Sequence, residues 1–281
     1  MKNLFAGKES SEKKENTGSA PRGDSNAQES SSESPSGVKK SKKQRVLILL
    51  LAAAVCGVLV TGAFHVYYDV IVYGRTQRER EEAVRQYRED KFARYRAENE
   101  SGITADVLFL GDSLTDGCDL ERWYPGLISL NRGIGGDTTY TLLERLQVSA
   151  FDAKADVVVL LIGGNNVDTM LENYEDIVVS LRQNMPESRL IICSLTAMGR
   201  DWARKNDTAV KNNLVLEQIA ARNGCAFVDL FTPLYDAQTC EIRAEYTVDG
   251  AHLTDAGYTV VSGLLRPLID FMLAEQDANL P

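Results

Sequence analysis

Short apolar runs alternate with segments of helical spacing from residue 104 to the C-terminus. The runs read ADVLFL, LISLN, DVVVLLI, RLIICSL and CAFVDL. Runs of this kind are typical of strands in a parallel sheet whose two faces are both covered. The segments between them, near residues 138–148, 174–184, 207–222 and 254–273, repeat apolar positions at the period of a helix. The pattern predicts an α/β domain over residues 104–281, with a five-stranded parallel sheet and helices on both faces.

A longer apolar run precedes this domain. Residues 46–64 form a stretch of 19 without a charge, and a helix of that length spans about 30 Å, the thickness of the hydrocarbon core of a bilayer. Basic residues before the run and aromatic residues after it are typical of a span with a cytoplasmic N-terminus. We therefore expect a transmembrane helix at residues 46–66, with the N-terminal tail in the cytoplasm and everything after residue 75 outside. The flanking residues are Lys39, Lys40, Lys42, Lys43 and Arg45 before the run, and Tyr67, Tyr68 and Tyr73 after it.

Two other interpretations of the run stay open. It could belong to a cleaved signal peptide, for which Thr61, Gly62 and Ala63 would make a poor cleavage site, or it could be a buried helix of a soluble core. A polar leader of 45 residues is long for a signal peptide. The run also lacks the polar face of a core helix, so we favour an uncleaved anchor.

The segments on either side of the run are polar. Residues 1–45 are rich in Ser, Lys, Glu and Gly and hold almost no large apolar residues, which is typical of a disordered tail. Residues 67–103 include a densely charged stretch without Pro or Gly, which favours a helical stalk. A sparse apolar stripe would either dock this stalk on the next domain or leave it a solvated spacer. The stripe consists of Val84, Tyr87, Phe92 and Tyr95.

Charge and cysteine content restrict the class of function. The tail carries ten Lys and Arg against six Asp and Glu, so its net +4 leaves −13 on the rest of a chain whose total is −9. An acidic folded part argues against nucleic acid as a partner. The five cysteines do not suggest a disulfide framework, although Cys118 and Cys240 lie in loops and leave a pair open. The only histidines are His65 and His252, so no zinc-type spacing occurs and we expect no metal or other cofactor.

Polar, Gly-rich stretches follow the first three strands and precede the last helix. They read GDSLT (111–115), NRGIGGDTT (131–139), GGNN (163–166) and DGAHLT (249–254). Taken alone, each has a structural explanation as a turn or a helix cap, for which Asp137 or Thr138 is suited. Taken together, they supply a nucleophile, a base, a carboxylate and oxyanion donors at the edge where open α/β sheets bind ligands. The combination indicates acyl transfer.

These stretches resemble the four blocks of the SGNH (GDSL) hydrolase family. The longer strings LNRGIGGDTTYTLLERL and VVVLLIGGNN are similar to the branch that contains platelet-activating-factor acetylhydrolase catalytic subunits and bacterial acetylesterases. The resemblance implies a flavodoxin-like fold, with Ser113 as nucleophile, His252 as general base and Asp249 as the carboxylate that orients the base. It also implies an oxyanion hole made by the Ser113 N–H, the Gly133 N–H and the side-chain amide of Asn165.

The chemistry of the residues is consistent with these roles. His252 is the only histidine of the domain, and a neutral imidazole can take a serine proton near neutral pH. Asp249 lies three residues earlier in the same loop and can hold its Nδ1–H. Asp112 is expected to fix the nucleophile loop by accepting backbone N–H groups. Residues 196–206 are a candidate substrate loop with Trp202 and Arg200 as contacts, or else an ordinary solvent loop.

We therefore expect a membrane-anchored serine esterase. Its substrate would carry small acyl groups, above all acetyl, on an extracytoplasmic molecule such as cell-wall glycan. Two alternatives stay open: a lysophospholipase or thioesterase that acts on membrane lipid, and a catalytically silent glycan-binding module.

Overall fold

The computed structural model describes residues 41–278. These residues divide into two units, one that ends at Asp69 and one that begins at Val70. The first unit contains helix α1 (Lys42–Val66), and a π-helical segment η1 (Tyr67–Tyr73) follows it. Most of the expected disordered tail lies outside the described residues, and the end of that segment forms the first turn of α1.

Helix α1 begins before the apolar run because a capping box fixes its start. The Ser41 hydroxyl accepts the N–H of Gln44 at 3.3 Å, and the Ser41 N–H donates to the Gln44 side chain at 3.0 Å. Within Lys42–Glu100 one segment is long and apolar enough to cross a membrane, by length and composition. Helix α1 buries none of its residues, so the alternative of a buried core helix finds no support.

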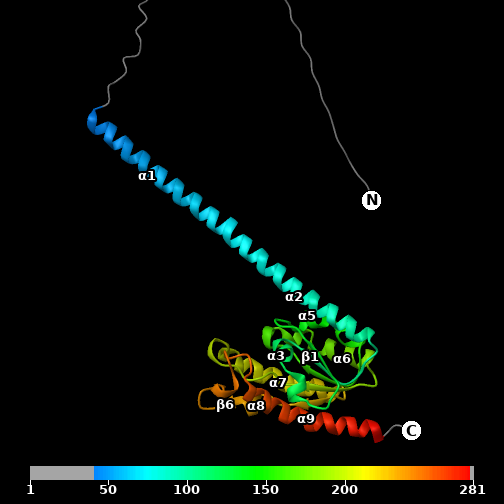
Figure 1. The fold of residues 1–281 in the computed structure, drawn as a ribbon. Coiled ribbons are helices and arrows are strands. Elements are labelled where there is room, and N and C mark those ends of the chain that lie inside the picture. Colours follow the sequence, from blue (N-terminus) through cyan, green and yellow to red (C-terminus); the bar gives the residue numbers. More distant parts are fainter. Residues whose placement is uncertain (1–40, 279–281) are drawn as a thin grey trace, which may run out of the picture. The chain divides into compact units, whose positions relative to one another are not determined.

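The second unit contains the five-stranded parallel sheet that the apolar runs predict (Figure 1). The strands are β1 (Thr104–Gly111), β2 (Ser129–Gly133), β3 (Lys154–Leu161), β4 (Arg189–Cys193) and β5 (Ala226–Val228), in the order β2-β1-β3-β4-β5. Most residues of β1 and β3 are buried because both faces are covered, which explains their continuous apolar runs. The register pairs Gly111 with Gly133 and with Leu161 at the ends of three strands. The polar stretches after these strands therefore meet at one edge of the sheet.

Short elements that periodicity could not predict connect the strands or lie between β5 and the last helix. A segment of a few residues is too short to show a helical or strand period. The candidate substrate loop, for example, contains a 3-10 helix. The short elements are α3 (Ser113–Asp116), α4 (Leu120–Trp123), η3 (Gly164–Asn166), η4 (Met170–Glu172), η5 (Arg200–Lys205), α8 (Phe231–Leu234), η6 (Ala244–Tyr246) and the antiparallel pair β6 (Tyr235–Asp236) and β7 (Glu241–Ile242).

Longer helices cover both faces of the sheet. They are α5 (Thr139–Glu144), α6 (Tyr174–Asn184), α7 (Asn206–Arg222) and α9 (Asp255–Ala278), with a π-helical turn η2 (Gln147–Phe151) after α5. Helix α9 packs against α4 and β3, and α5 packs against α6. Right-handed crossovers put these two groups on opposite faces. The predicted helices are thus confirmed, except that the one expected at 138–148 is split into α5 and η2. The five cysteines are all free, so the pair left open for Cys118 and Cys240 is not formed.

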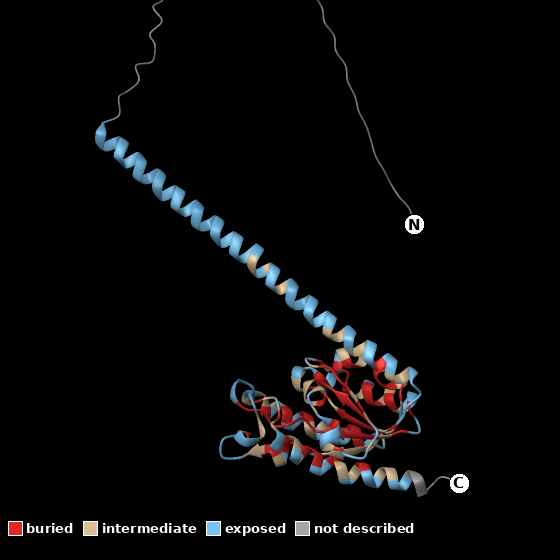
Figure 2. Cartoon of the chain, in the orientation of Figure 1, coloured by how far each residue is buried: buried red, intermediate tan, exposed pale blue. Residues whose placement is uncertain are grey.

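Helix α2 (Gly74–Glu100) is exposed along its first half and docked along its second half (Figure 2). Tyr95 is buried, and its hydroxyl donates to the carbonyl of Gly133 at 2.7 Å. Val84, by contrast, remains 58% exposed. The second half of α2 therefore docks on the domain, and the first half is a solvated spacer, so each of the two alternatives for the stalk holds for one half of the helix.

Candidate active site

Ser113 begins helix α3 directly after β1. Gly111, the last residue of β1, leaves no room for a side chain, since a Cβ there would lie 2.3 Å from the carbonyl oxygen of Leu161. Asp112 caps α3, because its Oδ1 accepts the N–H of Leu114 at 3.1 Å. This bond confirms the expected structural role of Asp112. The turn holds Ser113 at the carboxyl edge of the sheet, with its N–H at a helix start where no intrahelical acceptor exists.

The loop between η6 and α9 brings a carboxylate and an imidazole to Ser113. Asp249 Oδ1 accepts the N–H groups of Ala251 at 2.9 Å and of His252 at 2.8 Å, while its Oδ2 lies 2.6 Å from His252 Nδ1. His252 Nε2 lies 3.1 Å from Ser113 Oγ. A carboxylate against Nδ1 selects the tautomer with the proton on Nδ1, which leaves Nε2 to accept the serine proton. The three expected residues thus form one continuous hydrogen-bonded chain.

Hydrogen bonds rather than burial hold the Asp249 and His252 pair. The backbone N–H and then the imidazole of His252 bind the ionised carboxylate, and they hold the pKa of Asp249 well below its usual range. The side chains of His252 and Asp249 are 51% and 47% exposed. Water therefore screens the attraction between the charges, and the orientation of the imidazole depends on the loop geometry.

The two asparagines after β3 differ in what their side chains bind. Asn165 Nδ2 donates to the carbonyl of Asp137 at 2.9 Å, which fixes the amide and leaves its second hydrogen for a ligand. Asn166 is tied to the start of α5, where its Nδ2 donates to Thr139 Oγ1 at 2.9 Å and its Oδ1 accepts the Thr139 N–H at 3.2 Å. Asn165 is thus placed to donate a hydrogen bond at the site, and Asn166 is not.

The expected role of Gly133 as an oxyanion donor is corrected by the structure. The Gly133 N–H donates to Asn131 Oδ1 at 2.9 Å, so it has no hydrogen left for a ligand. A Cβ at this position would lie 2.1 Å from the backbone nitrogen of Asp116. Gly133 is therefore needed for the close approach of β2 to α3.

Gly136 has an unbonded N–H beside Ser113 that sequence reasoning missed. Its φ of 82° lies in the left-handed region that favours glycine, and within residues 41–278 its N–H makes no hydrogen bond. It lies between Gly135, whose Cβ position would be 3.9 Å from Ser113 Cβ, and Asp137, whose carbonyl binds Asn165. The paired glycines of GIGG indicate a turn here, but the sequence alone does not say which N–H stays free.

Asp112 is a buried carboxyl next to the nucleophile. Only 5% of it is exposed, and burial raises its pKa to about 7, although the Leu114 N–H counteracts part of this rise. The folded state therefore binds this proton more tightly than the unfolded chain, whose carboxyl has its ordinary pKa of about 3.9. The bound proton of Asp112 therefore adds to the free energy of unfolding. This contribution is complete below the ordinary pKa and is lost as the pH rises through about 7.

Replacing Asp112 with Asn should remove this pH dependence, because Asn is neutral at every pH and keeps the capping oxygen. Between about pH 5 and pH 8, the free energy of unfolding of the unsubstituted protein should fall by about 2 kcal/mol more than that of Asp112→Asn. Denaturant unfolding at both pH values measures the difference, with the exposed Asp168→Asn as control. Equal pH dependence of Asp112→Asn and the unsubstituted protein would contradict the assignment.

A cavity of about 120 Å³ opens beside Ser113, with Leu114, Met198 and Trp202 among its lining residues. Met198 is buried and Trp202 is 40% exposed at the rim. Of the two expected loop contacts, Trp202 lines the cavity and Arg200 does not. Sequence reasoning missed Met198. Within residues 41–278 no cluster of three His, Cys, Asp or Glu side chains is placed to hold a metal ion.

Comparisons with known proteins point in the same direction as this geometry. The model of the GDSL-like Lipase/Acylhydrolase family matches residues 109–260, more than half of the chain. The chain is similar to platelet-activating factor acetylhydrolase IB subunit alpha1 of Homo sapiens, with 29% identity over 185 residues that cover 62% of this chain and 79% of the relative. It is similar to subunit alpha2 of Rattus norvegicus, with 29% identity over 183 residues that cover 60% of this chain and 78% of the relative. Among solved structures it is similar to a candidate platelet activating factor from Streptococcus pneumonia, with a TM-score of 0.63 and 26% identity over 70% of this chain and 99% of the other.

Proposed function

The chain belongs to the GDSL-like lipase/acylhydrolase family of carboxylic ester hydrolases, and we propose that Ser113 is its nucleophile, His252 its general base and Asp249 the carboxylate that orients the base. The observation that carries this proposal is the continuous chain from Asp249 Oδ2 through His252 to Ser113 Oγ, with separations of 2.6 Å and 3.1 Å. A catalytically silent glycan-binding module would have no need of such a chain.

The reaction follows from this geometry in two halves. Ser113 Oγ bonds to the ester carbonyl carbon while its proton passes to His252 Nε2, and the carbonyl electron pair moves onto the oxygen. The intermediate then expels the alcohol, which takes the proton from Nε2, and leaves an acyl group on Ser113. Water repeats the sequence against the acyl-enzyme, releases the carboxylic acid and returns the serine. Asp249 stabilises the imidazolium that forms in each half.

We assign three donors to the oxygen that becomes negative. They are the free amide hydrogen of Asn165, the Gly136 N–H and the Ser113 N–H. The first two are held together by the bond from Asn165 Nδ2 to the carbonyl of Asp137, at 2.9 Å. Donors fixed before the reaction lower the barrier because they need no reorganisation as charge develops.

The size of the cavity supports a small acyl group. Its volume of about 120 Å³ is well below the roughly 300–1,000 Å³ of pockets that enclose drug-sized ligands. The names of the human and rat relatives, both acetylhydrolases, also support acetyl. The half-exposed indole of Trp202 at the rim offers an apolar face with a polar edge, which suits a sugar ring of an acetylated glycan. We therefore propose an O-acetylated glycan as the substrate.

We also propose that α1 anchors the enzyme in a membrane, with the esterase on the extracytoplasmic side. The length and composition of the apolar segment support the anchor. The side rests on the basic residues before the segment and the tyrosines after it. Protease protection of the full chain in sealed vesicles of known orientation tests it. Protection of the hydrolase domain when the cytoplasmic face is outward supports the proposal, and cleavage there contradicts it.

The substrate is tested with the full chain in detergent. We expect faster turnover of acetyl than of decanoyl p-nitrophenyl esters, and release of acetate from O-acetylated glycan, with Ser113→Ala as control. Faster turnover of decanoyl esters and of lysophospholipid would favour the lipid-directed alternative. An unsubstituted protein as inert as Ser113→Ala across a broad ester panel would refute the proposed function.

Asn165→Ala should lower kcat by about 10²- to 10³-fold, the usual effect of losing one oxyanion donor. The neighbouring Asn166→Ala is the matched control, because its amide binds Thr139 at the start of α5 instead of the site. We expect Asn166→Ala to lower the unfolding midpoint and to leave kcat close to the unsubstituted value. Steady-state kinetics and thermal unfolding of both variants measure this, and equal kcat values for the two would contradict the role of Asn165.

A further inference from the structure

Helix α2 binds the turn that carries the proposed oxyanion donor Gly136. The hydroxyl of Tyr87 accepts the N–H of Gly135, the preceding residue, at 2.8 Å. The same hydroxyl donates to Asp116 Oδ2 at the end of helix α3, which begins with Ser113. A single side chain of α2 thus joins the turn at Gly135 and Gly136, called the oxyanion turn below, to helix α3, which carries Ser113.

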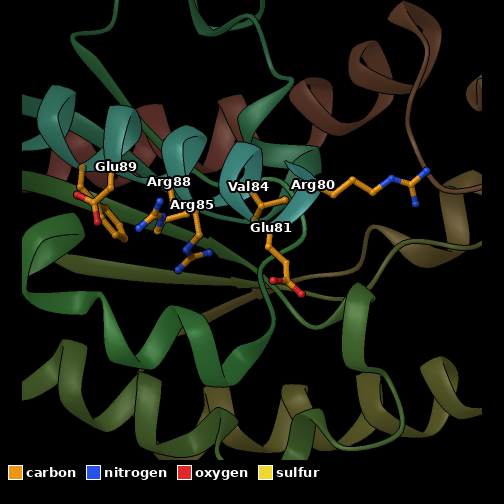
Figure 3. A pocket seen from close by; sticks show the side chains of 7 residues that line it. Arg80, Glu81, Val84, Arg85, Arg88 and Glu89 are labelled. Atoms are coloured by element: carbon orange, nitrogen blue, oxygen red, sulfur yellow. The ribbon is translucent and has the colours of Figure 1, made fainter. Parts of the chain in front are cut away.

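Two charged side chains of α2 reinforce this connection. Lys91 Nζ pairs with Asp116 Oδ1, and Arg88 pairs with Asp137, the buried residue that follows Gly136. Figure 3 shows the face of α2 that carries Arg88, where it also lines a cavity of about 430 Å³ along the helix. Both residues beside Gly136 in the chain are therefore held from α2.

The Tyr87 hydroxyl can keep both bonds over the working pH range. Burial and the bond to Asp116 raise the pKa of Tyr87 to about 12. The phenol therefore stays protonated, so that its hydrogen is directed at Asp116 while its lone pair accepts the Gly135 N–H.

We propose that Tyr87 is a positioning residue of the esterase. It fixes the turn of Gly135 and Gly136 against α3, so that the Gly136 N–H is directed at the oxygen bound beside Ser113. The inference rests on the proposed function, because an oxyanion hole matters only to acyl transfer. The hydrolase domain therefore includes the docked second half of α2, which the sequence analysis placed in the stalk.

Tyr87→Phe in the full chain tests this role. Losing one oxyanion donor costs about 10²- to 10³-fold, and this variant keeps the donor but loosens it, so we expect kcat to fall by about tenfold or more with KM unchanged. Hydrogen–deuterium exchange of residues 134–137 should become faster as well, because the Gly135 N–H loses its acceptor.

Tyr95→Phe is the matched control. It removes one hydroxyl from the same helix, and that hydroxyl binds the carbonyl of Gly133 at 2.7 Å instead of the turn. We expect this variant to unfold at a temperature similar to that of Tyr87→Phe while its kcat stays within about threefold of the unsubstituted value. A purely structural role for α2 would lower kcat equally in the two variants.

The outcomes separate the inference from the proposed function. If the unsubstituted protein is active and Tyr87→Phe keeps its kcat, or loses no more than Tyr95→Phe, the positioning role is refuted and the proposed function stands. If the unsubstituted protein hydrolyses no ester of the panel, the proposed function is refuted and the inference with it. A kcat loss confined to Tyr87→Phe, together with faster exchange at 134–137, supports the positioning role.

Discussion

Ser113→Ala is expected to lower kcat for ester hydrolysis by roughly 10⁶-fold, because Ser113 is the only hydroxyl within residues 41–278 that contacts His252 Nε2. His252→Ala should cause a loss of similar size, since a serine hydroxyl without a base is a poor nucleophile near neutral pH. The two residues act as one unit, so the double variant should be no slower than either single variant.

Active-site titration and initial rates on p-nitrophenyl acetate measure these losses. Ser180→Ala on α6 is the matched serine control and should keep its activity. The substituted proteins should show the thermal unfolding of the unsubstituted chain, because both positions are accessible to solvent. Losses that multiply in the double variant would show that Ser113 and His252 act independently, which contradicts the proposed transfer of the proton.

Asp249→Asn is expected to lower kcat by about 10³- to 10⁴-fold while the loop keeps its shape. The Asn oxygen can still accept the N–H groups of Ala251 and His252, but its amide can donate to Nδ1 where the carboxylate only accepts. That donation would place the imidazole proton on Nε2, which could then no longer take the Ser113 proton.

The control for Asp249→Asn is Asp255→Asn at the start of α9. Asp255 pairs with Arg122 on the surface, at 2.7 Å, and a surface pair of this kind contributes little. Its loss should therefore leave kcat unchanged, as measured by initial rates on the acetyl ester. A loss of less than about tenfold for Asp249→Asn would mean that the loop orients His252 without help from the carboxylate charge.

The sheet was predictable because its signal is local and repeated. Each strand is a continuous apolar run, and the polar stretch that follows three of the strands must lie at the carboxyl edge of a parallel sheet. The hydrogen-bonded arrangement of Asp249, His252 and Ser113 was predictable for a different reason. The domain offers only His252 as an imidazole, and Asp249 lies close to it in the same turn, so few other arrangements were available.

The proposed oxyanion donor Gly136 and the proposed role of α2 could not be predicted in the same way. The sequence does not distinguish Gly133, Gly135 and Gly136 as donors. Only the hydrogen bonds of the structure show that the N–H groups of the first two already have acceptors. The stripe on α2 is too sparse to decide between docking and solvation. Tyr87 contacts residues that lie 29 and 48 positions further along the chain, a separation at which no periodicity gives a signal.

If α1 anchors the enzyme in a membrane, as proposed, the division of α2 into an exposed half and a docked half bears on how the enzyme could be released. The exposed half carries Arg75, Arg78, Arg80 and Arg85, which are targets for trypsin-like proteases, and it lies before Tyr87. A cut there would release an enzyme that keeps Tyr87 and its bond to the Gly135 N–H. A cut after Arg88 would remove Tyr87 together with the proposed anchor. The same helix would therefore determine whether the shed protein is active or inactive, according to where it is cleaved.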